Sequence, residues 1–344
     1  MKELLARLVQ GEHLSEAQAE EAVGIIMRGE ATAAQVGAFL TALRCNGESI
    51  EEIVGCARAM RAFASVVRCQ RPLLVDTCGT GGDGAGTFNI STTAAFVVAG
   101  VGIAVAKHGN RAASSRSGSA DVLQALGVHI ELEPAAVARC LDEVGIGFLF
   151  AQRHHTAMRH VGPVRSELGF RTVFNVLGPL TNPAGAQVQV VGVGSAALVL
   201  PMAEALRRLG TRRSLVVHGC DGLDEVTLGG NTLVADTIRT GSDGLPVVYE
   251  ITPEEAGLPR VSLTALAGGD PQVNAAITEA VLRGEPGPRR DVVCLNAAAA
   301  LMAAGRVEDW REGVGLATRA IDGGAAWRKL EDLRRCSQRE AHAL

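Results

Sequence analysis

The sequence has few aromatic residues, no long hydrophobic run and no long run of lysine and arginine. Aromatic side chains make up 3% of its 344 residues, and 37 acidic residues outnumber 33 basic ones, which gives a net charge of -4. Because nucleic acids and anionic membranes attract basic surfaces, this balance predicts neither as a partner. The longest apolar stretch, near residues 94–106, is interrupted by glycines and is too short to span a bilayer.

The cysteines form no C-x-x-C pair, so they indicate neither a zinc site nor a disulfide framework. We expect scattered, buried thiols of the kind found in the reducing cytosol. The eight positions are Cys45, Cys56, Cys69, Cys78, Cys140, Cys220, Cys294 and Cys336. The N-terminal stretch MKELLARLVQGE carries acidic residues and lacks the apolar core of a signal peptide, which predicts a cytoplasmic protein.

The length suits one large domain or two modest ones, and the first sixty-odd residues have a helical pattern. In a capping box, a hydroxyl accepts from the amide three residues on, and that residue's side chain reaches back. Three such pairs occur: Ser15 with Gln18, Thr32 with Gln35, and Ser49 with Glu52. This part therefore predicts a packed helical layer, which could also form a dimer face.

From residue 71 onwards the pattern changes to strands alternating with helices, which is typical of an α/β layer. Expected strands are 73–77, 103–107, 187–194 and 214–219, and a later β portion covers 232–239 and 245–251. Ser91 or Thr92 and Ser119 are expected to cap two helices, and further helices are expected at 134–144, 197–209 and 291–304. Residues 148–183, which contain three prolines, predict an irregular segment with short helical turns.

A glycine-rich stretch, DTCGTGGDGAGTFNIST at residues 76–92, follows the first expected strand. Gly79, Gly81 and Gly84 match G-x-G-x-x-G, but a dinucleotide site also needs an acid about twenty residues on. No Asp or Glu occurs from Gly84 to Ala120. A Walker A loop needs Gly-Lys-Ser/Thr, and here Ala and Gly follow Gly84. Both familiar nucleotide motifs are therefore excluded.

The acid-free window instead contains many groups that bind anions. Glycine-loop amides, the Ser91 and Thr92 hydroxyls and a helix N-terminus can face one anion. The segment KHGNRAASSRSGS, residues 107–119, adds a lysine, arginines and four serines. Two such loops that follow strands of one sheet would meet at the carboxyl ends of those strands. The alternative is two unrelated turns whose serines cap helices.

An acidic loop follows the strand at 214–219 and reads HGCDGLDEV, residues 218–226. Asp221, Asp224 and Glu225 suit Mg²⁺, which takes a few carboxylates together with water and substrate phosphate oxygens. The alternative is a solvated acidic turn. A diphosphate bound by the basic segment would favour the metal, because its charge needs neutralising.

A third segment, residues 153–184, contains three histidines and several arginines. His154, His155 and His160 lack the i, i+4 spacing and the neighbouring acid of a zinc site, so zinc is not expected. An arginine here can hold a substrate carboxylate with two parallel hydrogen bonds. An ion pair with Glu167 is the alternative.

These motifs together resemble the anthranilate phosphoribosyltransferase family. The resemblance rests on DTCGTGGDGAGTFNIST, VAKHGNRAASSRSGSADVLQALG, VRSELGFRTVFNVLGPLTNPA and VVHGCDGLDEVT, in this order, and it covers nearly the whole chain. It implies a small helical domain (residues 1–68 with a middle helical insertion at about 132–184) and an α/β domain with a mostly parallel sheet (69–131 and 185–344). The family transfers phosphoribose from phosphoribosyl pyrophosphate to the amine of anthranilate in tryptophan biosynthesis, with one or two Mg²⁺ ions, and commonly dimerises through the helical domain.

The resemblance also assigns residues. The phosphoribosyl pyrophosphate positions are Gly79, Gly82, Asp83, Thr87, Asn89, Ile90, Ser91, Thr92, Lys107, His108, Gly109, Asn110, Arg111, Ser114, Ser115 and Ser119. The anthranilate positions are Gly79, Asn110, Arg165, His108 and His154, and the metal ligands are Ser91, Asp224 and Glu225. No covalent nucleophile is implied, and His108 is the candidate proton acceptor.

Two rival functions and one departure accompany this resemblance. A pyrimidine nucleoside phosphorylase shares the fold but would use inorganic phosphate and a nucleoside without magnesium. The pair Asp224 and Glu225 argues against it, as do TFNIST and KHGNR. A catalytically silent, nucleic-acid-binding relative would need basic and aromatic surface stretches that this sequence lacks. The departure is Thr156, which stands where relatives often have proline. It affects the expected rigidity of the chain beside the anthranilate site.

Overall fold

The computed structural model describes residues 1–112 and 115–342, and it begins with four helices. These are α1 (Lys2–Val9), α2 (Glu16–Met27), α3 (Ala33–Asn46) and α4 (Ile50–Ala62). All three predicted capping boxes are confirmed, because Ser15, Thr32 and Ser49 each precede a helix and make both reciprocal hydrogen bonds. The local sequence therefore fixes where these helices begin.

Helices α2 and α4 approach closely because α4 contains Gly55 at the crossing. A Cβ atom at this position would overlap the carbonyl oxygen of Glu16 and lie 2.9 Å from the amide nitrogen of Glu20. The glycine thus lets two backbones touch, which builds the helical layer without large side chains between them.

A seven-stranded sheet forms the centre of the larger part, in the order β3-β2-β1-β4-β5-β6-β7. Strands β1 to β5 run parallel, and β6 and β7 add an antiparallel hairpin at one edge. The strands are β1 (Val75–Gly79), β2 (Val105–Gly109), β3 (Ile146–Phe150), β4 (Val188–Gly192), β5 (Arg213–Gly219), β6 (Thr232–Thr240) and β7 (Pro246–Ile251). The predicted mostly parallel sheet is confirmed.

Alternation along the central strands divides the apolar side chains between two cores. Val188 and Val190 of β4 pack into one cluster, whereas Val191 packs into the other. In β5, Leu215 and Val217 belong to the first cluster and Val216 to the second. Successive side chains of a strand point to opposite faces, so both faces of the sheet are buried, as is usual for parallel sheets.

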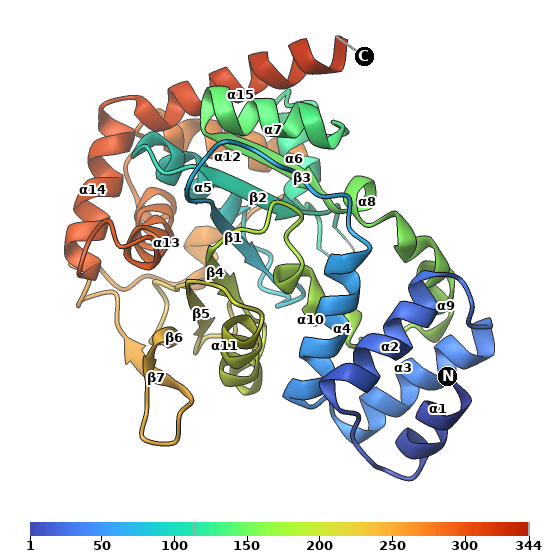
Figure 1. Ribbon diagram of the computed structural model, residues 1–344. Coiled ribbons are helices and arrows are strands. Elements are labelled where there is room, and N and C mark those ends of the chain that lie inside the picture. Colours follow the sequence, from blue (N-terminus) through green and yellow to red (C-terminus); the bar gives the residue numbers. More distant parts are fainter. Residues whose placement is uncertain (113–114, 343–344) are drawn as a thin grey trace.

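A different set of helices covers each face of the sheet (Figure 1). The first core includes α5 (Ile90–Gly100), α6 (Ser119–Ala125), α7 (Pro134–Val144), α12 (Pro271–Leu282), α13 (Pro288–Ala303), α14 (Trp310–Asp322) and α15 (Ala325–His342). The second core joins α11 (Val199–Arg208) to the N-terminal helices. The helical layer and the sheet therefore share one continuous apolar interior.

The middle of the chain contributes to both parts of the structure. Helix α7 packs against β3 and α15, and β3 is an edge strand of the sheet. The expected helical insertion at 132–184 is therefore corrected, because residues 134–150 belong to the sheet layer. After Phe150 come α8 (Ala151–His154), η1 (Thr156–His160), α9 (Gly162–Leu168), α10 (Phe174–Leu177) and η2 (Gly178–Leu180). The apolar residues of α9 and α10 join the core of the N-terminal helices.

Two predicted helix caps are wrong by one to three residues. Helix α5 begins at Ile90, so Asn89 occupies the cap position expected for Ser91 or Thr92. Helix α6 begins at Ser119 itself, with Gly118 as its cap. The carboxylate of Asp121 accepts from the Gly118 amide at 2.9 Å, so it satisfies the helix end in place of the serine hydroxyl.

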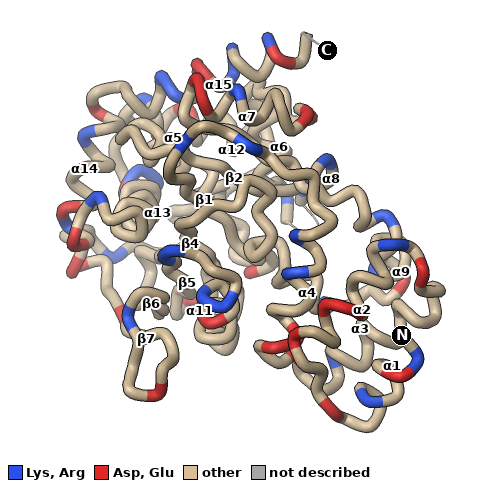
Figure 2. The backbone as a smooth tube through the Cα atoms, viewed as in Figure 1, with Lys and Arg blue, Asp and Glu red and all other residues tan. Residues whose placement is uncertain are grey.

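Charges of both signs are interspersed along the chain (Figure 2). Basic and acidic residues alternate over the N-terminal helices and over α14 and α15, in keeping with the net charge of -4. Within the described part of the chain, no helix is both long enough and apolar enough to cross a membrane.

Candidate active site

The glycine loop leaves β1 and lies beside the ends of the neighbouring parallel strands. Gly81 and Gly82 have φ values of 65° and 75°, a region that other residues rarely enter. Thr87 forms an isolated antiparallel bridge with Ala267, and the Phe88 amide donates to the Leu266 carbonyl at 3.2 Å. The loop is thus held at its far end while its glycines remain exposed.

The acidic loop between β5 and β6 folds onto the glycine loop. Asp224 Oδ2 accepts from the Gly81 amide at 2.9 Å, and Glu225 Oε1 accepts from the Ser91 amide at 3.1 Å. Asp83 Oδ2 accepts from the Asp224 amide at 3.4 Å. The structure therefore brings together the three predicted metal ligands, although they come from distant parts of the sequence.

Burial and mutual repulsion disfavour the ionised forms of these carboxyl groups. Burial raises the pKa of Asp224 well above its usual value, and repulsion from Glu225 and Asp83 adds to the rise. Burial also raises the pKa of Glu225 to about 7, although the Lys107 ammonium opposes the change. A cation would relieve this repulsion.

The residues present fit Mg²⁺ better than a metal held entirely by protein. Among residues 1–112 and 115–342, no group of three or more His, Cys, Asp and Glu side chains is arranged to hold a metal ion. Mg²⁺ typically uses one or two carboxylates together with water and substrate phosphates. Asp224, Glu225 and the Ser91 hydroxyl suit that role, while Asp221 instead accepts from Thr227 Oγ1 at 2.6 Å.

The Lys107 side chain is buried and does not extend into either phosphate loop. Its Nζ donates to the Thr77 carbonyl, and only 3% of the residue is exposed. Burial lowers the pKa of Lys107, and the charges of Asp76 and Glu225 counteract that effect. In this structure the ammonium therefore acts on the acidic loop through its field.

His108 is oriented by hydrogen bonds from two different segments. Its Nδ1 donates to the Gly178 carbonyl at 3.1 Å, which leaves Nε2 as an acceptor. Its amide donates to Asp76 Oδ1 at 3.1 Å, and Asn182 Nδ2 donates to Asp76 Oδ2 at 2.7 Å. Burial lowers the pKa of His108 well below its usual value, so the ring is neutral. Asp76 and Asn182 were not singled out from the sequence.

Of the two adjacent histidines, His155 is the one beside His108. Their ring centroids lie 5.1 Å apart, whereas Nδ1 of His154 is 3.0 Å from the Ser65 carbonyl oxygen. Burial lowers the pKa of His155 to about 4. The Nε2 atoms of all three rings are buried without a hydrogen-bond partner among the described residues. The sequence prediction named His154 and not His155 beside His108, and the adjacent histidines HH gave no local signal to choose between them.

Arg165 on α9 is half-buried and pairs with an amide and not with Glu167. Its Nη2 donates to Asn175 Oδ1 at 3.3 Å, and its guanidinium lies 5.7 Å from the Phe174 ring centre. The Thr172 amide donates to the same Asn175 oxygen at 2.8 Å. The arginine is therefore held by a neutral partner, which leaves its charge available to a carboxylate.

The second predicted phosphate segment folds back on itself after β2. The Asn110 carbonyl accepts from Ser119 Oγ at 3.3 Å, and a Cβ at Gly109 would overlap that hydroxyl. Arg111 donates to Asp121 at 3.0 Å, so its charge is paired within the segment. Ser115 is exposed, and the prediction for Ser114 lies outside the described residues.

Asn89 connects the two predicted phosphate loops. Its Oδ1 accepts from Ser117 Oγ at 3.2 Å and from Asn274 Nδ2 at 3.0 Å. Ile90 and Thr92, in the next turn, have buried side chains, so their backbones and not their side chains are available to a ligand. The loops thus converge as the alternation of strands and helices predicted.

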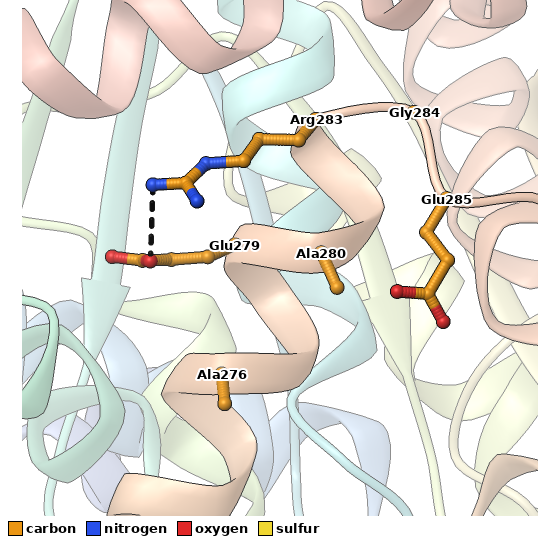
Figure 3. A pocket seen from close by; sticks show the side chains of 6 residues that line it. All are labelled: Ala276, Glu279, Ala280, Arg283, Gly284 and Glu285. Atoms are coloured by element: carbon orange, nitrogen blue, oxygen red, sulfur yellow. Dashed lines mark hydrogen bonds and ion pairs between the residues drawn. The ribbon is translucent and has the colours of Figure 1, made fainter.

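A separate surface hollow of about 590 Å³ lies at the C-terminal end of α12. In Figure 3, Arg283 and Glu279 point toward each other and form an ion pair of 3.4 Å, while Glu285 extends on the other side of the helix. Small residues make up the rest of its wall, namely Ala276, Ala280 and Gly284. It contains none of the predicted site residues.

Comparisons with known proteins match both parts of the chain. The glycosyl transferase family, helical bundle domain, matches residues 2–64, and the glycosyl transferase family, a/b domain, matches residues 71–327. An anthranilate phosphoribosyltransferase from Symbiobacterium thermophilum is 58% identical over 339 residues, which cover 98% of each chain.

Solved structures agree over the same length. The crystal structure of anthranilate phosphoribosyltransferase from Thermus thermophilus has a TM-score of 0.91 at 49% identity, covering 97% of this chain and 99% of its own. The enzyme of that name from Saccharomyces cerevisiae, in complex with PRPP and Mg, has a TM-score of 0.89 at 30% identity, covering 98% and 97%.

Proposed function

The chain belongs to the anthranilate phosphoribosyltransferase family, and we propose that it makes N-(5-phosphoribosyl)anthranilate in tryptophan biosynthesis. The phosphoribosyl group comes from phosphoribosyl pyrophosphate, and pyrophosphate leaves. The observation that carries this proposal is the contact of the acidic loop with the glycine loop, through Asp224 with Gly81 and Glu225 with Ser91. In that contact, the carboxylate oxygens that would bind the metal lie beside the exposed amides of the glycine loop.

The reaction is a substitution at the anomeric carbon of the ribose. The bond to the pyrophosphate oxygen breaks, and a bond to the anthranilate nitrogen forms. Loop amides and the first turn of α5 bind the diphosphate, where a helix N-terminus favours negative charge. Asp224, Glu225 and Ser91 would hold Mg²⁺. When bound, the cation neutralises charge developing on the leaving group.

The arylamine side of the site needs positioning more than activation. The amine is neutral near pH 7, so aligning it with the anomeric carbon supplies much of the rate effect. Arg165 orients the anthranilate carboxylate. His108 presents Nε2 as a neutral acceptor, so it can take the proton that leaves the amine after the bond forms.

The assembly and location of the enzyme are part of the same proposal. We propose a homodimer through the helical layer, as the resemblance to the family implies. Sedimentation equilibrium would test it, and a monomer at all concentrations would contradict it. We also propose a cytoplasmic enzyme, which cell fractionation would test.

The activity is tested by following the loss of anthranilate fluorescence with phosphoribosyl pyrophosphate and Mg²⁺. We expect turnover that depends on all three components. No turnover by folded protein would overturn the assignment. Phosphate-dependent release of uracil or thymine from a nucleoside, without Mg²⁺, would instead identify a nucleoside phosphorylase.

A further inference from the structure

Arg171, in the turn between α9 and α10, contacts the glycine loop. Its Nη2 donates to the Gly81 carbonyl at 3.3 Å. Its Nη1 lies so close to Gly82 that a Cβ at that residue would overlap it. The side chain is exposed, so the single hydrogen bond contributes little to the free energy of unfolding.

Asn175, on α10, connects this turn to Arg165, on α9. The Asn175 side-chain oxygen accepts from Arg165 Nη2 and from the amide of Thr172, the residue that follows Arg171. The two arginines are therefore attached to one hydrogen-bonded turn. One of them reaches the glycine loop, and the other is the proposed anchor of the anthranilate carboxylate.

We propose that Arg171 is a positioning residue that couples the two substrate sites. The inference rests on the proposed function. By holding Gly81 and Gly82, the guanidinium keeps the loop in the conformation that receives the diphosphate and places positive charge beside it. Through Thr172 and Asn175, a diphosphate that orders this loop also orders Arg165. By thermodynamic linkage, each substrate then binds more tightly in the presence of the other.

Steady-state kinetics of Arg171→Ala provide the first test. We expect KM for phosphoribosyl pyrophosphate to rise by about tenfold, the scale of one lost charged hydrogen bond, with a smaller change in kcat. Arg171→Lys keeps the charge but loses the planar guanidinium, so its KM should lie between the values for the unaltered enzyme and Arg171→Ala. Arg159→Ala is the matched control, because the Arg159 side chain is exposed on η1 and makes no hydrogen bond or ion pair with the described residues.

Calorimetric titration of anthranilate, with and without magnesium pyrophosphate as a non-reacting probe, measures the coupling itself. Pyrophosphate should tighten anthranilate binding to the unaltered enzyme and to Arg159→Ala. It should have little effect on Arg171→Ala or Asn175→Ala, and the double variant should lose no further coupling. Circular dichroism checks that each variant is folded. If Arg171→Ala unfolds, the same titrations are carried out with Arg171→Lys and Arg171→Gln.

The outcomes separate the two proposals. An active enzyme whose coupling and KM survive Arg171→Ala would overturn the role of Arg171 and leave the function intact. An unaltered enzyme that binds both probes but does not turn over would overturn the function.

Discussion

The Asp224 carboxylate accepts a hydrogen bond from the Gly81 amide at 2.9 Å, across 143 positions of sequence. The neighbouring carboxylate, Glu225, accepts from the Ser91 amide. Asp224 therefore has one oxygen bound to the glycine loop and Glu225 one oxygen bound to the first turn of α5, which leaves further oxygen lone pairs for a cation. The acids that are proposed to bind the metal thus also hold the glycine loop and the start of α5.

Replacing both carboxylates should change the response to magnesium. In Asp224→Asn with Glu225→Gln, each side chain keeps its size and an oxygen acceptor but loses its charge. We expect kcat/KM to fall by about a hundredfold or more, and the Mg²⁺ concentration for half-maximal rate to rise. Rates measured over a magnesium titration check this. Asp221→Asn in the same loop is the control, since Asp221 bonds Thr227. An unchanged magnesium response in the double variant would remove both residues from the metal role.

Two glycine substitutions should separate strain from collision in the glycine loop. Gly82 and Gly84 have similar φ values, 75° and 71°, so alanine costs about 1 kcal/mol of backbone strain at either position. A Cβ at Gly82 would also overlap Arg171, whereas nothing lies within 4 Å of one at Gly84. We expect Gly82→Ala to raise KM for phosphoribosyl pyrophosphate several-fold more than Gly84→Ala.

Adding Arg171→Ala supplies the control for this comparison. The second substitution removes the colliding group, so the excess effect of Gly82→Ala over Gly84→Ala should become smaller. Equal effects of the two alanines in the unaltered background would show that the collision has no consequence for binding.

Removing the amide of Asn182 should destabilise the fold. Asn182 Nδ2 donates to Asp76 Oδ2 at 2.7 Å and to the Ala106 carbonyl at 2.8 Å. The side chains of Asn182 and Asp76 are both buried. Asn182→Ala leaves a buried carboxylate short of a donor, which costs about 1–3 kcal/mol or more. Urea unfolding followed by circular dichroism measures it. Asn231→Ala, which removes an exposed bond to Glu250, should cost much less. Equal losses would contradict the special role of the buried contact.

Local signals predicted part of this structure well. The capping boxes at Ser15, Thr32 and Ser49 act within three residues, so no tertiary information is needed to find them. The convergence of the glycine loop and the 107–119 segment also followed from parallel strands, whose carboxyl ends share one edge.

Other features depend on contacts that the sequence pattern does not encode. Strand β3 is a five-residue apolar run, too short for periodicity to distinguish it from an irregular buried segment. Asp76 and Asn182 meet across 106 positions, and nothing local to either indicates the partner. His154 and His155 are adjacent, so only the three-dimensional path of the chain after β3 decides which ring lies beside His108.

The buried ring of His155 should make the protein less stable as pH falls. Its pKa is about 4 in the folded protein, against an ordinary value near 6.5. Between these values the unfolded chain binds a proton that the folded protein does not, so the free energy of unfolding decreases as pH is lowered. Above the upper value both states are neutral and the effect disappears. The loss through this window is at most about 3 kcal/mol for this ring.

Urea unfolding at several pH values between about 7 and 5 measures this slope. Glu225, whose pKa is raised to about 7, contributes a slope of opposite sign, so the contribution of His155 is the difference between the unaltered protein and His155→Gln, which cannot take up a proton in this range. His155→Gln should lose less stability on acidification than the unaltered protein. His342→Gln, at the exposed end of α15, is the control and should leave the slope unchanged. Burial also lowers the pKa values of His108 and His154, so adding His108→Gln should reduce the loss of stability on acidification further. A slope unaffected by His155→Gln would show that this ring is protonated as readily in the folded protein as in the unfolded chain.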